Sequence, residues 1–276
     1  MKIPRIIPKL DIKGPNLVKG VNLEGLRVLG DPRSFIKSYY ELGADELVYH
    51  DTVASLYLRN NLDKLLKATS KNIFMPIIVG GGIRSLQDVE TMLVSGADRV
   101  FFNTAALGNP KLIRNTVKKF GSSTIVISIE AMRLQNNYIC LKDFGRERTN
   151  IKITDWILQI QDSGAGEVII TSINKEGTGK GFDLELCEKI SKVAKIPFII
   201  NGGFGELKHI SDLLNVCLPS GICISSAFHY SNKPSKEIKI NKNEGNFEFL
   251  KKNKNFLNFG NISIKDVKNY INKVLK

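Results

Sequence analysis

Two acidic residues stand where apolar, β-rich runs of the sequence end. Asp11 lies near the end of "RIIPKLDI" (5–12) and Glu130 near the end of "TIVISIEA" (124–131). Two carboxylates that face each other across a substrate can act as general acid and general base, because their surroundings separate their pKa values. The alternative is that each only caps a loop or pairs with a nearby cation, for which Lys9, Lys13 and Arg133 are available.

Other apolar runs end in glycines and small polar residues. Glycine lets backbone N–H groups approach an oxyanion closely, and Asn, Ser or Thr adds further donors, so such endings predict phosphate cradles, although any tight turn also uses glycine. The first predicted cradle contains Gly81, Gly82, Asn103 and Thr104, and the second contains Gly202, Gly203, Ser225 and Ser226. Two cradles predict a substrate that is phosphorylated at both ends.

Four charged residues stand at the opposite, opening ends of such runs. They are Arg5, Glu46, Arg99 and Glu167. Buried charges are costly unless they are paired, so mutual salt bridges are the simplest prediction. A ring of this kind could also act as a gate.

The elements that position these residues alternate along the chain. Eight apolar, β-rich runs alternate with eight helix-length segments that have apolar residues at helical spacing. This pattern predicts the α/β class and a parallel sheet covered by helices, and eight units close as a (β/α)8 TIM barrel with its chemistry at the carboxyl ends of the strands. A doubly wound open sheet is the alternative. The predicted strands are 5–12, 46–53, 76–82, 99–105, 124–131, 167–173, 197–203 and 221–227, and the predicted helices are 33–43, 60–70, 85–95, 110–119, 154–164, 183–193, 206–215 and 264–275.

The sequence also repeats itself at an offset of about 120 residues. Asp11 matches Glu130, Glu46 matches Glu167, and "IIVGGG" matches "IINGGF". The repeat predicts two similar half-barrels and a site with pseudo-twofold symmetry. It therefore favours catalysis by Asp11 and Glu130 over simple loop capping.

A long segment, 13–32, separates the first predicted strand from the first predicted helix. A loop of this length in that place is often a lid. Lys19, within it, is a candidate to close over an anionic substrate, and a solvated loop lysine is the alternative.

Composition limits the remaining function classes. A chain of 276 residues fits one barrel domain, 1–276, with a Lys/Asn-rich insertion at about 231–261 before the last helix. The net charge of +13 comes from abundant basic residues that concentrate in 232–256, and no nucleic-acid-binding motif is present, so a solvated Lys/Asn-rich surface is expected. No run is long and apolar enough for a membrane span, and no signal peptide is recognisable, which predicts a cytoplasmic protein. The four cysteines lack metal-ligand spacing, so we expect free thiols, no metal and no cofactor.

From Arg5 to His229 the chain resembles the HisF family, the cyclase subunits of imidazole glycerol phosphate synthase. The resemblance rests on "RIIPKLDIK", "GADELVYHD", "VGGGIRSLQDVE", "GADRVFFNTAALGNP", "GTGKGFD" and "SSAFHY". It implies a heterodimer with a HisH-like glutaminase, whose ammonia passes the Arg/Glu gate and meets a bis-phosphorylated ribulosyl substrate. It also implies that Asp98 contacts the glutaminase and that Glu176, Gly177 and Thr178 bind substrate.

Several residues at the catalytic face depart from the family pattern. The second catalytic carboxylate is Glu130 instead of aspartate, Lys9 replaces a common cysteine, and "SINKEGT" replaces "SIDRDGT". An added methylene moves a carboxylate by about 1.5 Å, enough to cost on the order of 10²-fold in rate. A HisF-like paralogue that supplies ammonia to a surface-sugar amidotransferase is therefore the alternative function.

Two further classes share parts of this pattern. A HisA-like isomerase would have the cradles and the paired acids but no use for an ammonia gate. A non-catalytic activator of a glutaminase would keep the gate without needing Asp11, Lys19 or the cradles.

Overall fold

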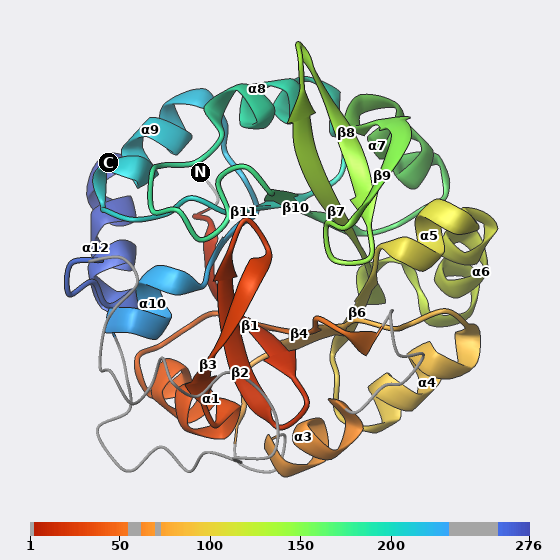
Figure 1. Cartoon of the computed structure of the whole chain (residues 1–276), viewed down its shortest axis with the longest axis horizontal. Helices are drawn as coiled ribbons and strands as arrows, with labels where there is room; N and C mark the ends of the chain where they lie inside the picture. The colour runs from red at the N-terminus through yellow and green to blue at the C-terminus, as the bar shows by residue number, and fades with distance from the viewer. Residues whose placement is uncertain (1–2, 55–61, 70–72, 232–258) are drawn as a thin grey trace.

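The computed structural model describes residues 3–54, 62–69, 73–231 and 259–276. Eight parallel strands form a closed barrel that a ring of helices surrounds (Figure 1), which confirms the predicted (β/α)8 fold. The strands follow the order β10-β11-β12-β1-β4-β5-β6-β7, and β7 pairs with β10 to close the barrel. Their bounds are β1 (Arg5–Lys13), β4 (Leu47–Asp51), β5 (Ile77–Gly80), β6 (Arg99–Phe102), β7 (Ile125–Leu134), β10 (Glu167–Ser172), β11 (Phe198–Asn201) and β12 (Gly221–Ile224).

Eight helices correspond to the predicted helical segments. Their apolar sides pack on the outward-facing side chains of the barrel strands. Capping boxes define the starts of two of them, with Ser85 and Asp88 at α4 and Ser263 and Asp266 at α12. The helices are α1 (Pro32–Glu41), α3 (Leu62–Thr69), α4 (Leu86–Val94), α6 (Lys111–Phe120), α7 (Ile153–Asp162), α8 (Leu184–Val193), α9 (Lys208–Val216) and α12 (Ile264–Val274); the short α5 (Thr104–Gly108), α10 (Ser226–Ser231) and the 3-10 turn η1 (Ser122–Thr124) were not predicted.

The prediction of a loop over 13–32 is wrong. This segment contains two antiparallel strands, β2 (Asn16–Val21) and β3 (Glu24–Gly30), which lie near the centre of the ring in Figure 1. Asn22 and Leu23 join them with positive φ angles of 53° and 65°, the pair of conformations that a tight hairpin turn requires. Leu23 is an unfavourable residue there, but its side chain is buried in an apolar cluster that also contains Phe144 and Ile173.

A second antiparallel extension follows β7 on the other half of the barrel. It consists of β8 (Asn137–Lys142) and β9 (Glu147–Lys152), and Phe144 lies in the turn between them. Leu23 and Phe144 belong to one buried apolar cluster, and Leu23 lies beside Gly145 in the β8–β9 turn, so the two extensions meet over the barrel mouth.

The barrel interior is layered because alternate residues of each strand point inward. Charged residues form the floor, polar residues lie toward the mouth, and an apolar layer separates the two. The apolar layer consists of Ile7, Val48, Ile78, Phe101, Val126, Ile169, Ile199 and Cys223.

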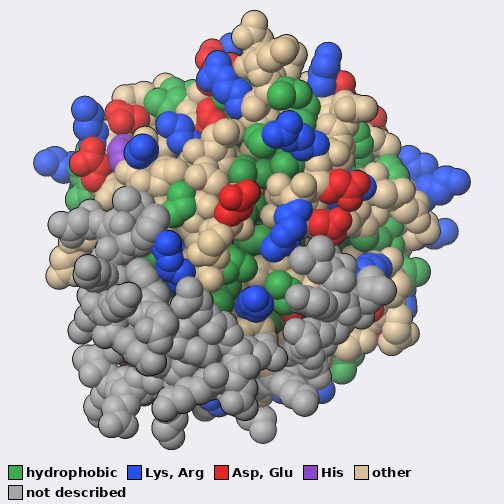
Figure 2. All heavy atoms as spheres, in the orientation of Figure 1, with side chains coloured by type: hydrophobic (Ala, Val, Ile, Leu, Met, Phe, Trp, Pro, Cys, Tyr) green, Lys and Arg blue, Asp and Glu red, His purple; other side chains and the backbone are tan. Residues whose placement is uncertain are grey.

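Most of the predicted insertion, residues 232–258, lies outside the described part of the chain. Within the described part, no helix combines the length and apolarity that a membrane crossing needs. On the face shown in Figure 2, the described Lys and Arg side chains are interspersed with acidic and apolar ones. The cysteines Cys140, Cys187, Cys217 and Cys223 are free and buried, as predicted.

Candidate functional site

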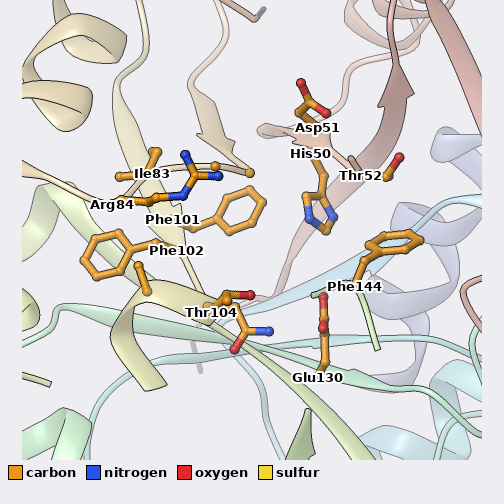
Figure 3. A pocket seen from close by; sticks show the side chains of 14 residues that line it. His50, Asp51, Thr52, Ile83, Arg84, Phe101, Phe102, Thr104, Glu130 and Phe144 are labelled. Carbon is orange, nitrogen blue, oxygen red and sulfur yellow. The ribbon is translucent and has the colours of Figure 1, made fainter. Parts of the chain in front are cut away.

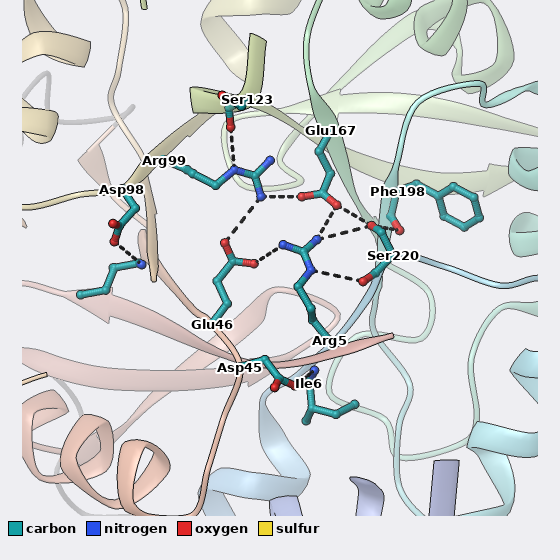
Figure 4. Close-up of polar contacts among 11 residues, drawn as sticks. Arg5, Ile6, Asp45, Glu46, Asp98, Arg99, Ser123, Glu167, Phe198 and Ser220 are labelled. Atoms are coloured by element: carbon teal, nitrogen blue, oxygen red, sulfur yellow. Dashed lines mark hydrogen bonds and ion pairs between the residues drawn. The ribbon is translucent and has the colours of Figure 1, made fainter. Parts of the chain in front are cut away.

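The four charged residues of the barrel floor form a closed ring of ion pairs (Figure 4). The guanidinium of Arg5 lies 2.7 Å from Glu46 Oε2 and 2.5 Å from Glu167 Oε1. Arg99 Nη1 lies 2.5 Å from Glu167 Oε2 and 3.5 Å from Glu46 Oε1. The predicted mutual salt bridges are therefore confirmed, and each carboxylate contacts both guanidinium groups.

Burial affects the two acids of this ring differently. Burial raises the pKa of Glu46 because Arg5 and Arg99 offset it only in part. For Glu167, burial acts in the same direction, but Arg99, Arg5 and Ser220 outweigh it and lower the pKa. Glu167 is thus the more firmly ionised member of the floor ring.

The first predicted cradle opens into a cavity of about 280 Å³ at the barrel mouth (Figure 3). Gly81, Gly82, Asn103 and Thr104 line it together with Glu130, so the structure brings these predicted residues to one place. Asn103 Nδ2 donates to Leu141 O, whereas Asn103 Oδ1 is buried without a hydrogen-bond partner in the described chain. A cradle that contains an unsatisfied polar atom of this kind is suited to a polar ligand.

The second predicted cradle is much tighter, with a cavity of about 10 Å³. Its hydroxyl donor, Ser225 Oγ, is also buried and without a partner among the described residues. One carboxylate already occupies part of it, because Glu176 Oε2 accepts a hydrogen bond of 3.2 Å from Asn201 Nδ2. The lining consists of Glu176, Gly177, Asn201, Gly202, Gly203, Phe204, Cys223, Ile224, Ser225 and Ser226.

Asp11 is enclosed by cations at the barrel mouth. Its Oδ1 accepts a hydrogen bond from Lys9, and its Oδ2 accepts one from Lys19 at 2.8 Å. Burial alone would raise the pKa of Asp11, but the ammonium groups of Lys19 and Lys9 outweigh it and hold the pKa well below its usual range. The pairing of Asp11 with Lys9, raised above as an alternative to catalysis, is therefore present.

Lys19 connects the β2–β3 hairpin to both halves of the barrel. It donates to Asp11 on β1 and also to Glu176, which follows β10. Near the hairpin turn, Asn22 N donates to Glu176 O at 2.8 Å and Asn22 Nδ2 donates to Ile173 O at 2.7 Å. Lys19 is fully enclosed by these contacts, so it is not a solvated loop lysine.

Glu130 has a different environment from its counterpart Asp11. Burial raises its pKa to about 7, and only one backbone donor, Gly145 N at 2.8 Å, opposes this shift by hydrogen bonding. One carboxyl is therefore firmly ionised, and the other exchanges its proton near neutral pH. Such a separation gives the two carboxyls different roles, because only Glu130 can donate or accept a proton readily near neutral pH.

Two predicted residues lie outside the cradles. Thr178 Oγ1 donates to Lys175 O within the turn after β10, and Thr178 does not line the second cradle. Asp98 is exposed beside the floor, where its Oδ2 accepts a hydrogen bond from Ile77 N at the start of β5. In the described residues, no cluster of His, Cys, Asp and Glu is arranged to hold a metal ion.

The cavity also contains residues that were not among the predicted site residues. His50, Phe101 and Phe144 project into it opposite Glu130 (Figure 3). His50 was recognisable in principle, because it occupies an inward position two residues after Val48 and is in register with Asp11. Phe144 was not, because its position depends on the unpredicted hairpin of β8 and β9.

Fold and site together define a class of protein: a (β/α)8 barrel with two buried acids and two glycine-lined cavities at its mouth and an ion-pair ring across its floor. Residues 5–234 match the family described as histidine biosynthesis protein. Imidazole glycerol phosphate synthase subunit HisF from Legionella pneumophila is 53% identical over 208 residues, which are 75% of this chain and 98% of that protein. The HisF subunit from Hydrogenobaculum sp. (strain Y04AAS1) is 40% identical over 250 residues, 89% of this chain and 98% of that protein. The chain belongs to the histidine biosynthesis protein family and, within it, to the HisF subunits of imidazole glycerol phosphate synthase.

Proposed function

We propose that this chain is the cyclase subunit of an imidazole glycerol phosphate synthase. It uses ammonia to convert a bis-phosphorylated ribulosyl aminoimidazole substrate to imidazole glycerol phosphate and an aminoimidazole ribotide. The observation that carries this proposal is the continuous order of layers inside the barrel. The floor ring is followed by the apolar layer, and the apolar layer is followed by a cavity that Glu130 and His50 line, with Asp11 behind His50.

The surface around the floor ring is suited to docking a subunit that produces ammonia. The apolar side chains of Ile3, Phe74 and Leu218 are exposed in the segments that lead into β1, β5 and β12, and Phe74 is 83% exposed. Together with the exposed Asp98, they provide an apolar and acidic docking face for a HisH-like glutaminase subunit. Uncharged ammonia would cross the apolar layer more readily than ammonium, because a charge is costly in such surroundings.

A second candidate function is the supply of ammonia for amidation of a surface sugar by a separate amidotransferase. Two features of the mouth favour it. Lys9 places an ammonium group directly above the apolar layer, and Glu176 places a carboxylate in the second cradle, where a phosphate would bind. A negative charge in that position opposes binding of a second phosphate.

One assay separates the two candidates. The purified protein is given the ribulosyl substrate and saturating ammonium salt, and imidazole glycerol phosphate is measured. Product formation supports the cyclase. Binding of the phosphorylated ligand without turnover supports the second candidate.

A further inference from the structure

His50 is a buried polar side chain that the proposed function leaves without a role. It lies on β4 directly opposite Asp11 of β1 in the parallel register, and strand alternation directs it inward above Val48 of the apolar layer. Its imidazole lines the same cavity as Glu130. The inference drawn from it rests on the proposed cyclase function.

The orientation of the imidazole is fixed from three sides. His50 Nδ1 lies 3.5 Å from Asp11 Oδ1, is fully buried, and has no closer polar partner among the described residues. The rings of Phe101 and Phe144 meet it edge to face, each with centroids 5.2 Å away and with interplanar angles of 74° and 63°. Figure 3 shows the imidazole between these two rings, and its Nδ1 is the ring nitrogen that lies near Asp11.

Asp11 by itself is a poor proton acceptor. Both of its carboxylate oxygens accept hydrogen bonds from ammonium groups, one from Lys9 and one from Lys19. A general base is effective when its pKa lies near the working pH, and two adjacent cations hold Asp11 far from that condition. Lys9, which stands where the family commonly has cysteine, contributes one of these cations.

We propose that His50 is the general base of this site and that Asp11 is its positioning partner. The neutral imidazole accepts a proton at Nε2, and the carboxylate of Asp11 orients the ring and stabilises the imidazolium that forms. The arrangement follows the logic of an acid–histidine dyad, in which the carboxylate stays ionised throughout.

The proton that His50 accepts in the assigned step is matched by a proton that Glu130 donates from the opposite side of the cavity. When ammonia adds to a ketone carbonyl, the carbonyl π bond breaks, leaving a positively charged nitrogen and an oxyanion. One N–H bond then breaks, its electron pair stays on nitrogen, and the proton passes to His50. Protonated Glu130 gives its proton to the oxyanion, so the product of this step is a neutral carbinolamine.

The charges around His50 determine the pH range in which its imidazole is neutral. It faces Lys9 and Asp11 from β1, Lys19 from β2 and Glu130 from β7, and the inward residue of β5 is a glycine. Burial and the cation of Lys9 lower the pKa of His50, and the contact with Asp11 opposes this shift. The imidazole is therefore neutral at pH 7, as a base must be. We expect a bell-shaped rate profile whose alkaline limb lies near the pKa of Glu130, about 7.

The kinetic test measures ammonium-dependent turnover of the ribulosyl substrate. His50→Gln should lose at least about 100-fold in kcat with little change in KM. Lys9→Met removes one cation from Asp11 and so raises the affinity of Asp11 for a proton. In a Lys9→Met background, the loss of kcat caused by His50→Gln should therefore be at least about tenfold smaller. The surface variant Lys37→Met serves as the matched control for loss of a lysine. A His50→Gln loss below about threefold, or an equal loss in both backgrounds, overturns the proposal.

A second readout does not depend on turnover. The chain has three histidines, so the imidazole signals of His50 can be assigned by their loss in His50→Gln. Asp11→Asn should lower the pKa of His50, measured by nitrogen-15 NMR, by at least about one unit, because the imidazolium loses its counter-charge. An unchanged His50 pKa refutes the dyad. If the unaltered protein fails to turn over the substrate, the cyclase function fails, and this titration still decides whether the dyad exists.

Discussion

Lys19 Nζ lies 2.8 Å from Asp11 Oδ2, so the β2–β3 hairpin is tied directly to a carboxylate at the barrel mouth. Lys19 also pairs with Glu176, and all three side chains are almost completely buried. The hairpin is therefore held in a closed position by ion pairs that solvent barely reaches. Of these three side chains, Glu176 also lines the second cradle.

Replacing Lys19 should destabilise the fold. Lys19→Met leaves the carboxylates of Asp11 and Glu176 without their shared cation, and breaking a buried pair in this way costs about 3–5 kcal/mol. Chemical denaturation measures the free energy of unfolding. The control is Lys37→Met, because Lys37 lies 3.9 Å from Glu41 in an exposed pair that is expected to contribute less than about 0.5 kcal/mol. Similar losses in both variants would contradict the buried network.

Stability should depend on pH through Glu130. Its pKa is about 7 in the folded protein against 4.5 for the free group, so the folded state binds this proton more tightly than the unfolded chain. The free energy of unfolding should therefore fall by up to about 3 kcal/mol as pH rises through this interval. Glu130→Gln should remove this slope, whereas Glu185→Gln on the surface of α8 should keep it. Parallel pH profiles for all three proteins would disprove the assignment.

Gly81 should be intolerant of any side chain. A Cβ atom there would lie 2.3 Å from the carbonyl oxygen of Asp51, at a φ of +104°. Gly121 has a similar φ of +87° but open space around it, so Gly121→Ala reports conformational strain alone, about 1–2 kcal/mol. We expect Gly81→Ala to cost at least about 2 kcal/mol more and to weaken phosphate binding. Equal free energies of unfolding for the two variants would contradict the close approach of position 81 to the carbonyl oxygen of Asp51.

Glu176 should limit phosphate binding in the second cradle. Glu176→Gln keeps the shape of the side chain, removes its negative charge and leaves Lys19 paired with Asp11 alone, so that Lys19 attracts an anion more strongly. Inorganic phosphate, titrated by phosphorus-31 NMR at low salt, should bind at least about tenfold more tightly. Glu185→Gln is again the matched control. Unchanged or weaker binding in Glu176→Gln would contradict this account.

The sequence was sufficient for the barrel because its strands and helices have long, repeated apolar patterns. The eight strand runs and eight helical segments were all found, and the floor charges were correctly paired, because a buried charge has few alternatives to a partner. The residues of each predicted cradle do line one cavity, since parallel strands bring their carboxyl ends together, and phosphate binding by them stays a prediction.

The two hairpins over the mouth were beyond a single-sequence prediction. Their strands are short, and the β2–β3 turn uses Leu23 at a positive φ, a residue that no turn pattern favours. The contribution of Phe144 to the cavity of the first cradle could not be predicted for the same reason. The difference in size between the two cradles depends on where the side chain of Glu176 points, which sequence alone does not specify.

The most direct test of the proposed function uses nitrogen-15 ammonium salt. The purified protein is incubated with the ribulosyl substrate and saturating labelled ammonium near pH 7, and the products are analysed by mass spectrometry and NMR. We expect imidazole glycerol phosphate that carries one nitrogen-15 atom in its ring, together with unlabelled aminoimidazole ribotide. Recovery of unchanged substrate, with the protein folded and the ligand bound, would contradict it.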